Sequence, residues 1–302
     1  MRRPICSGLV IVLLAACVAL NGCNRDERPH IVVGSKFFTE QVILAELLAQ
    51  HIEARLGVPV TRKSNLGGTL LCQKALLAGQ LDTYVEYTGT ALTAVLGESP
   101  GDVRPQGDAT AVYEEVKKQY AQRFGLVITE PLGFENSFAM VVRGTDAREF
   151  GLKTMSHLVR VAPRWRAGVG YEFLERPDGY TGWAQRYGLH FAETPRVMDL
   201  GLIYRALVER QVDVVAGNST DGLIEALKLY ALEDDRRYFP PYSAVPIVRR
   251  GALEKFPGLR EALTDLGGKV TSDEMRHMNY LVDAEQRDVR TVVAEFRRQK
   301  GL

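Results

Sequence analysis

The sequence predicts an α/β fold in two similar lobes. Short apolar strands alternate with amphipathic helices over residues 30–124, the order typical of a doubly wound lobe. The stretch Ala75–Thr90 (ALLAGQLDTYVEYTGT) also has an echo at Ala206–Asp221 (ALVERQVDVVAGNSTD), 131 positions later. Both read as a helix end, an apolar strand and a polar elbow. In two such units the carboxyl ends of the strands would face one cleft. The alternative is a chance similarity between two ordinary α/β units.

The first half of the chain predicts three strands separated by helices. We expect strands at residues 30–34, 58–63 and 81–87, the last with alternating faces. Thr39 is the expected N-cap of a helix that Gly57 stops. A turn at residues 65–69 opens a second helix ending at Gly79, and Asp108 caps a third helix that runs to Phe124.

Two crossovers are expected between the lobes. The first lies between strands 126–129 and 138–142, and the second is the proline-containing connector 236–242. Residues 154–218 repeat the α/β rhythm, and the tail from Gly251 reads as mostly helical. The expected division is therefore residues 30–134 plus 242–302 for lobe 1 and residues 135–241 for lobe 2, hinged around a central cleft.

The N-terminus reads as a secretion signal. Arg2 and Arg3 precede an apolar run that ends at Leu20-Asn21-Gly22-Cys23, followed by a charged tether. This pattern resembles a bacterial lipoprotein cleavage site, with residues 1–22 as signal peptide, Cys23 as lipid carrier and residues 23–30 as tether. Cys17 is a rival lipidation site, and an uncleaved anchor helix is the alternative. Each interpretation exports the rest of the chain and holds it at a membrane surface.

Composition argues against several classes of function. Without Arg2 and Arg3, the 38 Lys and Arg fall to 36 against 37 acids, a net charge of −1 with no nucleic-acid footprint. Cys72 is the one thiol left after processing, and we expect it in the core. The sequence shows no His-Glu-x-x-His, Gly-x-Ser-x-Gly or phosphate-loop pattern, and its five histidines are scattered. We therefore expect no enzyme activity, metal or cofactor.

Aromatic and cationic residues recur where strands or connectors end. These residues are Lys36, Tyr84, Tyr87, Phe138, Arg176 and Tyr242, with Thr90 in the elbow after Tyr87. Each aromatic alone is more often a core residue. Together they predict a pocket with ring faces at one end and cations at the other, which suits a zwitterion.

Several motifs, in order along residues 31–300, resemble the glycine betaine/carnitine/choline-binding proteins of osmoprotectant ABC transporters. The matching segments are Val33–Gln41, Asn65–Thr69, Tyr84–Thr90, Pro131–Asn136, Ser219–Gly222, Leu232–Asp235 and Phe239–Tyr242. The resemblance implies a type II periplasmic-binding-protein fold that closes on its ligand. It also implies delivery of that ligand to permease and ATPase subunits.

The resemblance also implies a ligand site. In that family four tyrosines cage a trimethylammonium group; Tyr87 and Tyr242 match two of them, whereas Phe138 and Asn218 stand at the other two positions. The family's carboxylate clamp is similar to Lys36, Thr90 and Arg176, and Asn136 completes the expected set. Tyr84, Tyr171 or Tyr180 are candidates for replacing the lost ring.

Because Asn218 stands where the family has a ring, the sequence does not decide which amine is the ligand. The expected ligand is glycine betaine, carnitine, choline or a related amine. One alternative is a non-osmolyte amine or a larger amino-acid betaine, for which an amide in a wider cage is suitable. Another is an inert envelope protein that uses the cleft as a scaffold, and an enzyme on the same fold would need a nucleophile, base or metal that the sequence does not offer.

Overall fold

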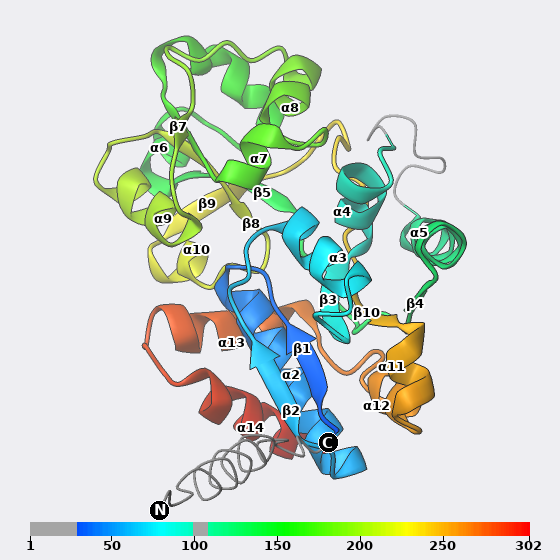
Figure 1. The fold of residues 1–302 in the computed structure, drawn as a ribbon. Coiled ribbons are helices and arrows are strands. Elements are labelled where there is room, and N and C mark those ends of the chain that lie inside the picture. Colours follow the sequence, from blue (N-terminus) through cyan, green and yellow to red (C-terminus); the bar gives the residue numbers. More distant parts are fainter. Residues whose placement is uncertain (1–28, 99–107) are drawn as a thin grey trace, which may run out of the picture. The chain divides into compact units, whose positions relative to one another are not determined.

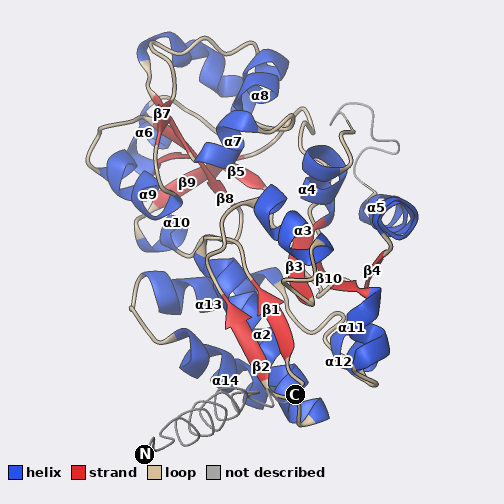
Figure 2. Ribbon diagram, in the orientation of Figure 1, coloured by secondary structure: helices blue, strands red, loops and turns tan. Residues whose placement is uncertain are grey.

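The computed structural model describes residues 29–98 and 108–302. The predicted signal peptide, Cys17, Cys23 and most of the tether lie outside the described residues. Ile31–Leu302 form one compact unit. Figures 1 and 2 show that this unit contains two separate sheets, each covered by helices.

The first sheet combines strands from both ends of the unit. Its order is β2-β1-β3-β10-β4, comprising β1 (Ile31–Gly34), β2 (Val60–Lys63), β3 (Thr83–Tyr87), β4 (Leu126–Ile128) and β10 (Ala244–Arg249). Strands β1, β2 and β3 are parallel, whereas β10 runs antiparallel to β3 and β4. The carboxyl ends of β1 and β3 and the start of β10 therefore lie at one edge of the sheet.

The second sheet repeats this arrangement. Its order is β7-β6-β8-β5-β9, comprising β5 (Phe138–Arg143), β6 (Ala167–Val169), β7 (Arg196–Val197), β8 (Val214–Asn218) and β9 (Leu229–Leu232). Strands β6, β7 and β8 are parallel, and β5 runs antiparallel to β8 and β9. Strands β7, β6, β8, β5 and β9 thus occupy the positions and directions that β2, β1, β3, β10 and β4 have in the first sheet. This correspondence confirms the two-lobed α/β fold that the sequence echo predicted.

Helices bury both faces of the first sheet. One face packs against α2 (Thr39–Leu56), α11 (Arg250–Lys255), α12 (Leu259–Thr264), α13 (Ser272–Asp283) and α14 (Val289–Lys300). The other face packs against α3 (Thr69–Leu77), the short α4 (Thr88–Thr90), the π-helical turn η2 (Ala91–Val95) and α5 (Ala109–Phe124). The predicted helical tail is confirmed, and Cys72 is a buried core residue as expected.

Helices and 3₁₀ turns also cover the second sheet. They are α6 (Gly144–Glu149), η4 (Met155–Arg160), η5 (Ala162–Arg164), α7 (Tyr171–Glu175), α8 (Tyr180–Tyr187), α9 (Leu200–Val208) and α10 (Leu223–Ala226). Two apolar clusters lie on opposite faces of this sheet, one containing Trp165 and Trp183 and the other Ile203 and Leu207. Within the residues that the structure describes, no helix is long and apolar enough to cross a membrane.

One local prediction is wrong. Thr39 is the first residue of α2 rather than its cap, because its hydroxyl bonds to Asp283 at 2.5 Å and not to the helix backbone. The strand ending at Tyr87 alternates as predicted, with Tyr84 in the core on one face of the sheet and Val85 and Tyr87 in the core on the other. All five of its residues are buried, because helices cover both faces. The cap at Asp108 and the left-handed stop at Gly57 are confirmed.

Strand β10 is absent from the sequence-based prediction. Its sequence, AVPIVR, has a proline in the middle, which usually argues against a central strand. Here Pro246 lies opposite Val85, and its carbonyl accepts from Thr129 N at 3.1 Å. The residues around the proline show no alternation of polar and apolar side chains that would predict a strand. The strand is therefore identified only by its pairing with β3 in the structure.

Candidate ligand-binding site

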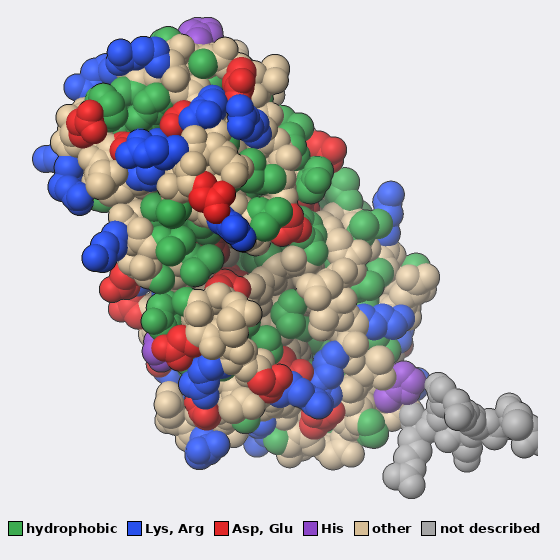
Figure 3. All heavy atoms as spheres, turned by 90° about the vertical axis from the view of Figure 1, so that its left-hand side faces the viewer, with side chains coloured by type: hydrophobic (Ala, Val, Ile, Leu, Met, Phe, Trp, Pro, Cys, Tyr) green, Lys and Arg blue, Asp and Glu red, His purple; other side chains and the backbone are tan. Residues whose placement is uncertain are grey.

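A cavity of about 560 Å³, counted with its open mouth, lies where the strand ends of both sheets meet. All eight residues expected to bind ligand line it: Lys36, Tyr87, Thr90, Asn136, Phe138, Arg176, Asn218 and Tyr242. This position follows from topology, because ligands in open α/β sheets gather at the carboxyl ends of strands. On the molecular face drawn in Figure 3, Lys and Arg side chains are interspersed with Asp and Glu side chains.

Aromatic rings form one wall of this cavity. The Phe138 ring lies 4.7 Å from that of Phe173 and 6.0 Å, edge-on, from that of Tyr242. The Tyr87 ring stacks at 6.4 Å on that of Phe38. The cavity therefore offers the ring faces that attract an organic cation.

The three tyrosines considered as substitutes for the lost ring differ in position. Tyr171, at the start of α7, lines the cavity. Tyr84 lies behind its wall, fully buried in the first sheet's core, where its hydroxyl contacts Glu86 and Gln73. Tyr180 packs against Trp183 in the second lobe and is not among the lining residues. Tyr171 is thus the candidate that the structure brings to the site.

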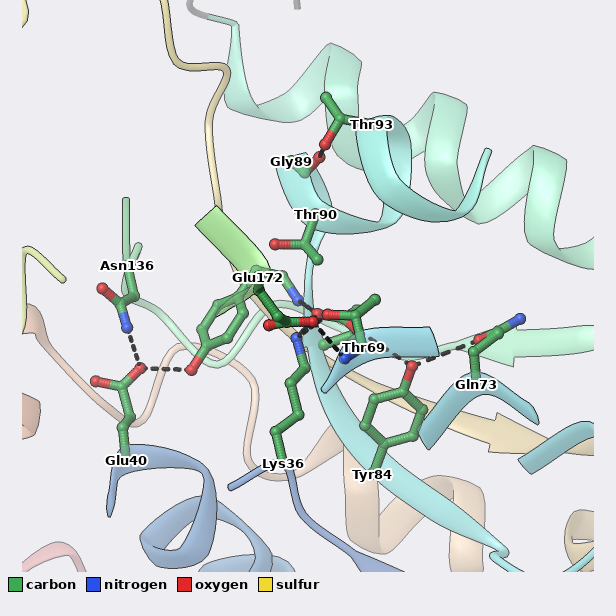
Figure 4. Close-up of polar contacts among 12 residues, drawn as sticks. Lys36, Glu40, Thr69, Gln73, Tyr84, Gly89, Thr90, Thr93, Asn136 and Glu172 are labelled. Carbon is green, nitrogen blue, oxygen red and sulfur yellow. Dashed lines mark hydrogen bonds and ion pairs between the residues drawn. The ribbon is translucent and has the colours of Figure 1, made fainter. Parts of the chain in front are cut away.

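Glu40 is a buried carboxylate behind this wall, and sequence reasoning did not select it. Its Oε1 accepts from the Tyr87 hydroxyl at 2.6 Å and from Asn136 Nδ2 at 2.8 Å (Figure 4). Its Oε2 accepts from Asn279 Nδ2 at 3.0 Å and from the hydroxyl of Thr220, which follows β8 of the second sheet. Burial raises the pKa of Glu40, and these four donors oppose that rise.

Asn136 has one unused acceptor at the cavity. Its Nδ2 is held by Glu40, but its buried Oδ1 has no hydrogen-bond partner among the described residues (Figure 4). A buried polar atom without a partner is costly. The amide oxygen therefore suits a ligand that presents a donor or a positively polarised group.

Lys36 is only 1% exposed and already has partners. Its ammonium forms an ion pair with Glu86 of β3 and donates to Thr69 Oγ1 at 3.0 Å. The same nitrogen lies 5.1 Å from the centre of the Tyr87 ring. An ammonium has three donors, so one is left for a ligand.

Arg176 is likewise neutralised by an internal carboxylate. Its Nε donates to Asp178 Oδ1 at 2.8 Å, and its second contact to that carboxylate completes a bidentate pair. Burial opposes the charge of Arg176, but Asp178 outweighs it and raises the pKa of the guanidinium. Arg176 also donates to Thr90 Oγ1 at 3.0 Å and covers the Phe138 ring at 4.9 Å.

Tyr242 uses its hydroxyl within the protein. It donates to Asp178 Oδ2, the same carboxylate that holds Arg176. Its ring also closes over Gly89 in the elbow, where an added Cβ would lie 2.7 Å from ring carbons. Tyr87 and Tyr242, the two tyrosines expected in a cage, therefore both line the cavity while a carboxylate accepts from each hydroxyl.

Asn218 separates the cavity from a second, acidic one. Its backbone N–H donates to Asp221 Oδ2 at 2.9 Å, and the Tyr204 hydroxyl reaches the same oxygen at 2.6 Å. Burial is the main cause that raises the pKa of Asp221 to about 6. The second cavity, about 1180 Å³ including open space, is also lined by Glu40, Asp221 and Asp283. Asn218, where the resemblance predicts a ring, thus places an amide at the point where the two cavities adjoin.

No group of three His, Cys, Asp or Glu residues with metal-binding geometry occurs in the described part of the chain.

Residues 29–299 match the family model described as the substrate-binding domain of the ABC-type glycine betaine transport system. The chain belongs to this family.

Relatives agree with this assignment over nearly the whole length. A glycine-betaine-binding protein of Pseudomonas aeruginosa is 35% identical, covering 97% of this chain and 95% of its own. A carnitine transport binding protein of Listeria monocytogenes is 33% identical, covering 98% and 96%. The crystal structure of a glycine betaine/carnitine/choline ABC transporter protein is 30% identical, with a TM-score of 0.73 over 90% of this chain and 98% of that one. The family confirms the predicted periplasmic-binding-protein fold and the function of a transporter's substrate-binding component.

Proposed function

We propose that this family member binds a small quaternary amine of the betaine type in the cleft and delivers it to an ABC permease. One observation supports this proposal above the others: the eight residues that the sequence predicts at the ligand site line a single cavity. Tyr87, Phe138 and Tyr242 would surround the ammonium group, each ring contributing roughly 0.5–2 kcal/mol when desolvated. Lys36, Thr90 and Arg176 would hold the polar end of the ligand by charge-assisted hydrogen bonds.

Ligand binding would close two lobes, residues 30–134 plus 242–302 and residues 135–241. Two side-chain contacts between the lobes support this proposal. Thr220 bonds to Glu40, and Arg176 bonds to Thr90. Because these contacts lie beside the cavity, closure would exclude water from the ligand and strengthen its polar contacts.

A thermal-shift screen followed by calorimetry tests this function. Glycine betaine, carnitine and choline are the probes, and glycine and ethanolamine, which lack the methylated ammonium, are matched controls. We expect the quaternary amines to stabilise the protein and the controls not to. If no quaternary amine binds, the ligand assignment is refuted, as the envelope-scaffold alternative would require.

A larger amino-acid betaine or a non-osmolyte amine is the second candidate. It is favoured by Asn218, because this residue opens the cage toward the cavity that contains Asp221. The same screen separates the two candidates when betaines with larger side groups are included. Stabilisation confined to glycine betaine, carnitine and choline would exclude the larger ligand.

We further propose that the protein performs no chemistry, needs no cofactor and works outside the cytoplasm, anchored by lipid on Cys23. Its partners would be the permease and ATPase subunits and the membrane that takes the lipid, with no nucleic acid. The N-terminal signal pattern supports the anchor. Cys23→Ser should release the protein from the membrane fraction. If Cys17→Ser releases it instead, the lipidated residue is Cys17.

A further inference from the structure

Glu172 reaches across the cleft to the first turn of α3. The backbone N–H of Thr69, the first residue of that helix, donates to Glu172 Oε1 at 2.6 Å (Figure 4). Helix α3 has no side-chain cap of its own, because its N-cap position is Gly68. An added Cβ at Gly68 would lie 2.5 Å from the Glu172 carboxylate, so glycine leaves room for the approach. Glu172 thus supplies a cap that α3 lacks, at the end of the helix where a negative charge is favourable.

Glu172 adds negative charge to the polar end of the cleft. The two cations there are each paired with their own carboxylate, Lys36 with Glu86 and Arg176 with Asp178. Glu172 makes no ion pair with any cation in residues 29–98 or 108–302. The charged side chains at this end of the cleft are therefore two cations (Lys36 and Arg176) and three carboxylates (Glu86, Asp178 and Glu172). Their formal charges add up to −1 before any ligand enters.

The position of Glu172 places this charge beside both cations. Lys36 donates to the hydroxyl of the same Thr69 whose N–H bonds to Glu172. Arg176 lies one turn further along the segment that carries Glu172, and the negative charge of Glu172 is among the causes that raise the pKa of Arg176. A ligand group held between Lys36 and Arg176 would therefore lie close to a third carboxylate.

We propose that Glu172 selects the polar end of the ligand, so that the cleft prefers quaternary ammonium alcohols over quaternary ammonium carboxylates. A hydroxyl can donate to Glu172 and accept from Lys36 or Arg176 at the same time. A ligand carboxylate can only accept, and its charge is repelled by Glu172. This inference rests on the proposed function, because it orders members of the ligand class already proposed.

Choline and glycine betaine are the probes for this selection, since they share the trimethylammonium group and differ at the polar end. We expect calorimetry on the full mature chain to give choline an affinity at least about tenfold higher, the scale of one screened charge contact at this range. Glu172→Gln keeps a carbonyl oxygen for the Thr69 N–H and removes the charge. This variant should shift the affinity ratio by about tenfold or more toward glycine betaine.

Glu175→Gln is the matched control, because Glu175 lies on the same helix but is exposed and outside the cavity lining. It should leave the ratio unchanged. Tighter binding of glycine betaine by the wild type, or an unchanged ratio in Glu172→Gln, would overturn the inference while leaving the proposed function standing. Failure of both probes to bind the wild type would overturn this inference, and the proposed function would fall with it only if carnitine and the larger betaines also fail to bind. If Glu172→Gln does not fold, the wild-type ratio still decides.

Discussion

Phe138 and Asn218 lie directly opposite each other on the antiparallel strands β5 and β8. Residues paired in this way point to the same face of a sheet and contact each other. They also stand at the two positions where the family resemblance leads us to expect cage tyrosines. The two expected cage positions that lack a tyrosine therefore form one cross-strand pair at the edge of the second sheet. Tyr87 and Tyr242, at the other two expected positions, belong to the first sheet's β3 and to the connector before β10.

Asn218→Tyr should restore the missing ring. Residue 218 is half-buried and borders two cavities, so a larger side chain has space without displacing the core. A restored ring face should tighten binding of trimethylammonium ligands by about 0.5–2 kcal/mol, roughly 2- to 30-fold. Isothermal calorimetry with choline and glycine betaine measures this gain. Phe138→Tyr is the control, since it adds a hydroxyl without adding a ring, and an equal gain in both variants would contradict the ring argument.

Tyr87→Ala and Tyr87→Phe should separate the ring of Tyr87 from its hydroxyl. The alanine variant loses the ring face and should weaken quaternary-amine binding by about 1–3 kcal/mol. The phenylalanine variant keeps the ring but deprives Glu40 of its 2.6 Å donor. We expect it to retain most of the affinity and to lose thermal stability instead. Calorimetry and melting curves on both variants give the two quantities, and unchanged affinity in Tyr87→Ala would remove Tyr87 from the site.

The cleft residues could be predicted from sequence because they follow strand ends. Lys36 lies two residues after β1 and Tyr87 is the last residue of β3, and topology brings such positions together. The role of Glu40 could not be predicted in this way. An acidic residue in the first turn of a helix is normally solvated. Glu40 is buried by side chains from distant parts of the chain, including Thr220, 180 positions away, and Asn279.

The charge balance of the cleft was also beyond sequence reasoning. Lys36 and Arg176 read as free cations that clamp a carboxylate. The structure gives Lys36 a partner in Glu86, a residue of the buried strand β3 that the sequence did not single out. Arg176 pairs with Asp178, two residues along, and their segment also contains Glu172. The sequence signal was present as three acids near Arg176, namely Glu172, Glu175 and Asp178, but which of their side chains point into the cleft depends on how α7 packs.

Thr220→Val should weaken every ligand to a similar degree. The Thr220 hydroxyl is the contact that joins the second sheet's elbow to the buried Glu40. Valine keeps the shape and removes the donor, and a hydrogen bond to a charged group is worth about 1.5–3 kcal/mol. Because this bond forms beside the cavity and not with ligand, we expect a faster dissociation rate with an unchanged choline-to-betaine ratio. Stopped-flow or surface-plasmon measurements test this, with Thr220→Ser as the control that retains the hydroxyl; a changed ratio would mean that Thr220 touches the ligand.

Asp221→Asn should flatten the dependence of stability on pH. Burial and the nearby Glu40 raise the pKa of Asp221 from 3.8 to about 6 in the folded protein. Between these values the native state binds more protons than the unfolded state, so the contribution of Asp221 to stability falls as pH rises from 3.8 through about 6. The shift corresponds to roughly 3 kcal/mol at most. Asparagine can still accept from Tyr204 and from the Asn218 N–H, so the variant should gain stability over wild type as pH increases from 4 to 7. Urea unfolding of both proteins at each pH measures that difference, in which other titrating groups cancel, and a difference independent of pH would show that Asp221 titrates normally.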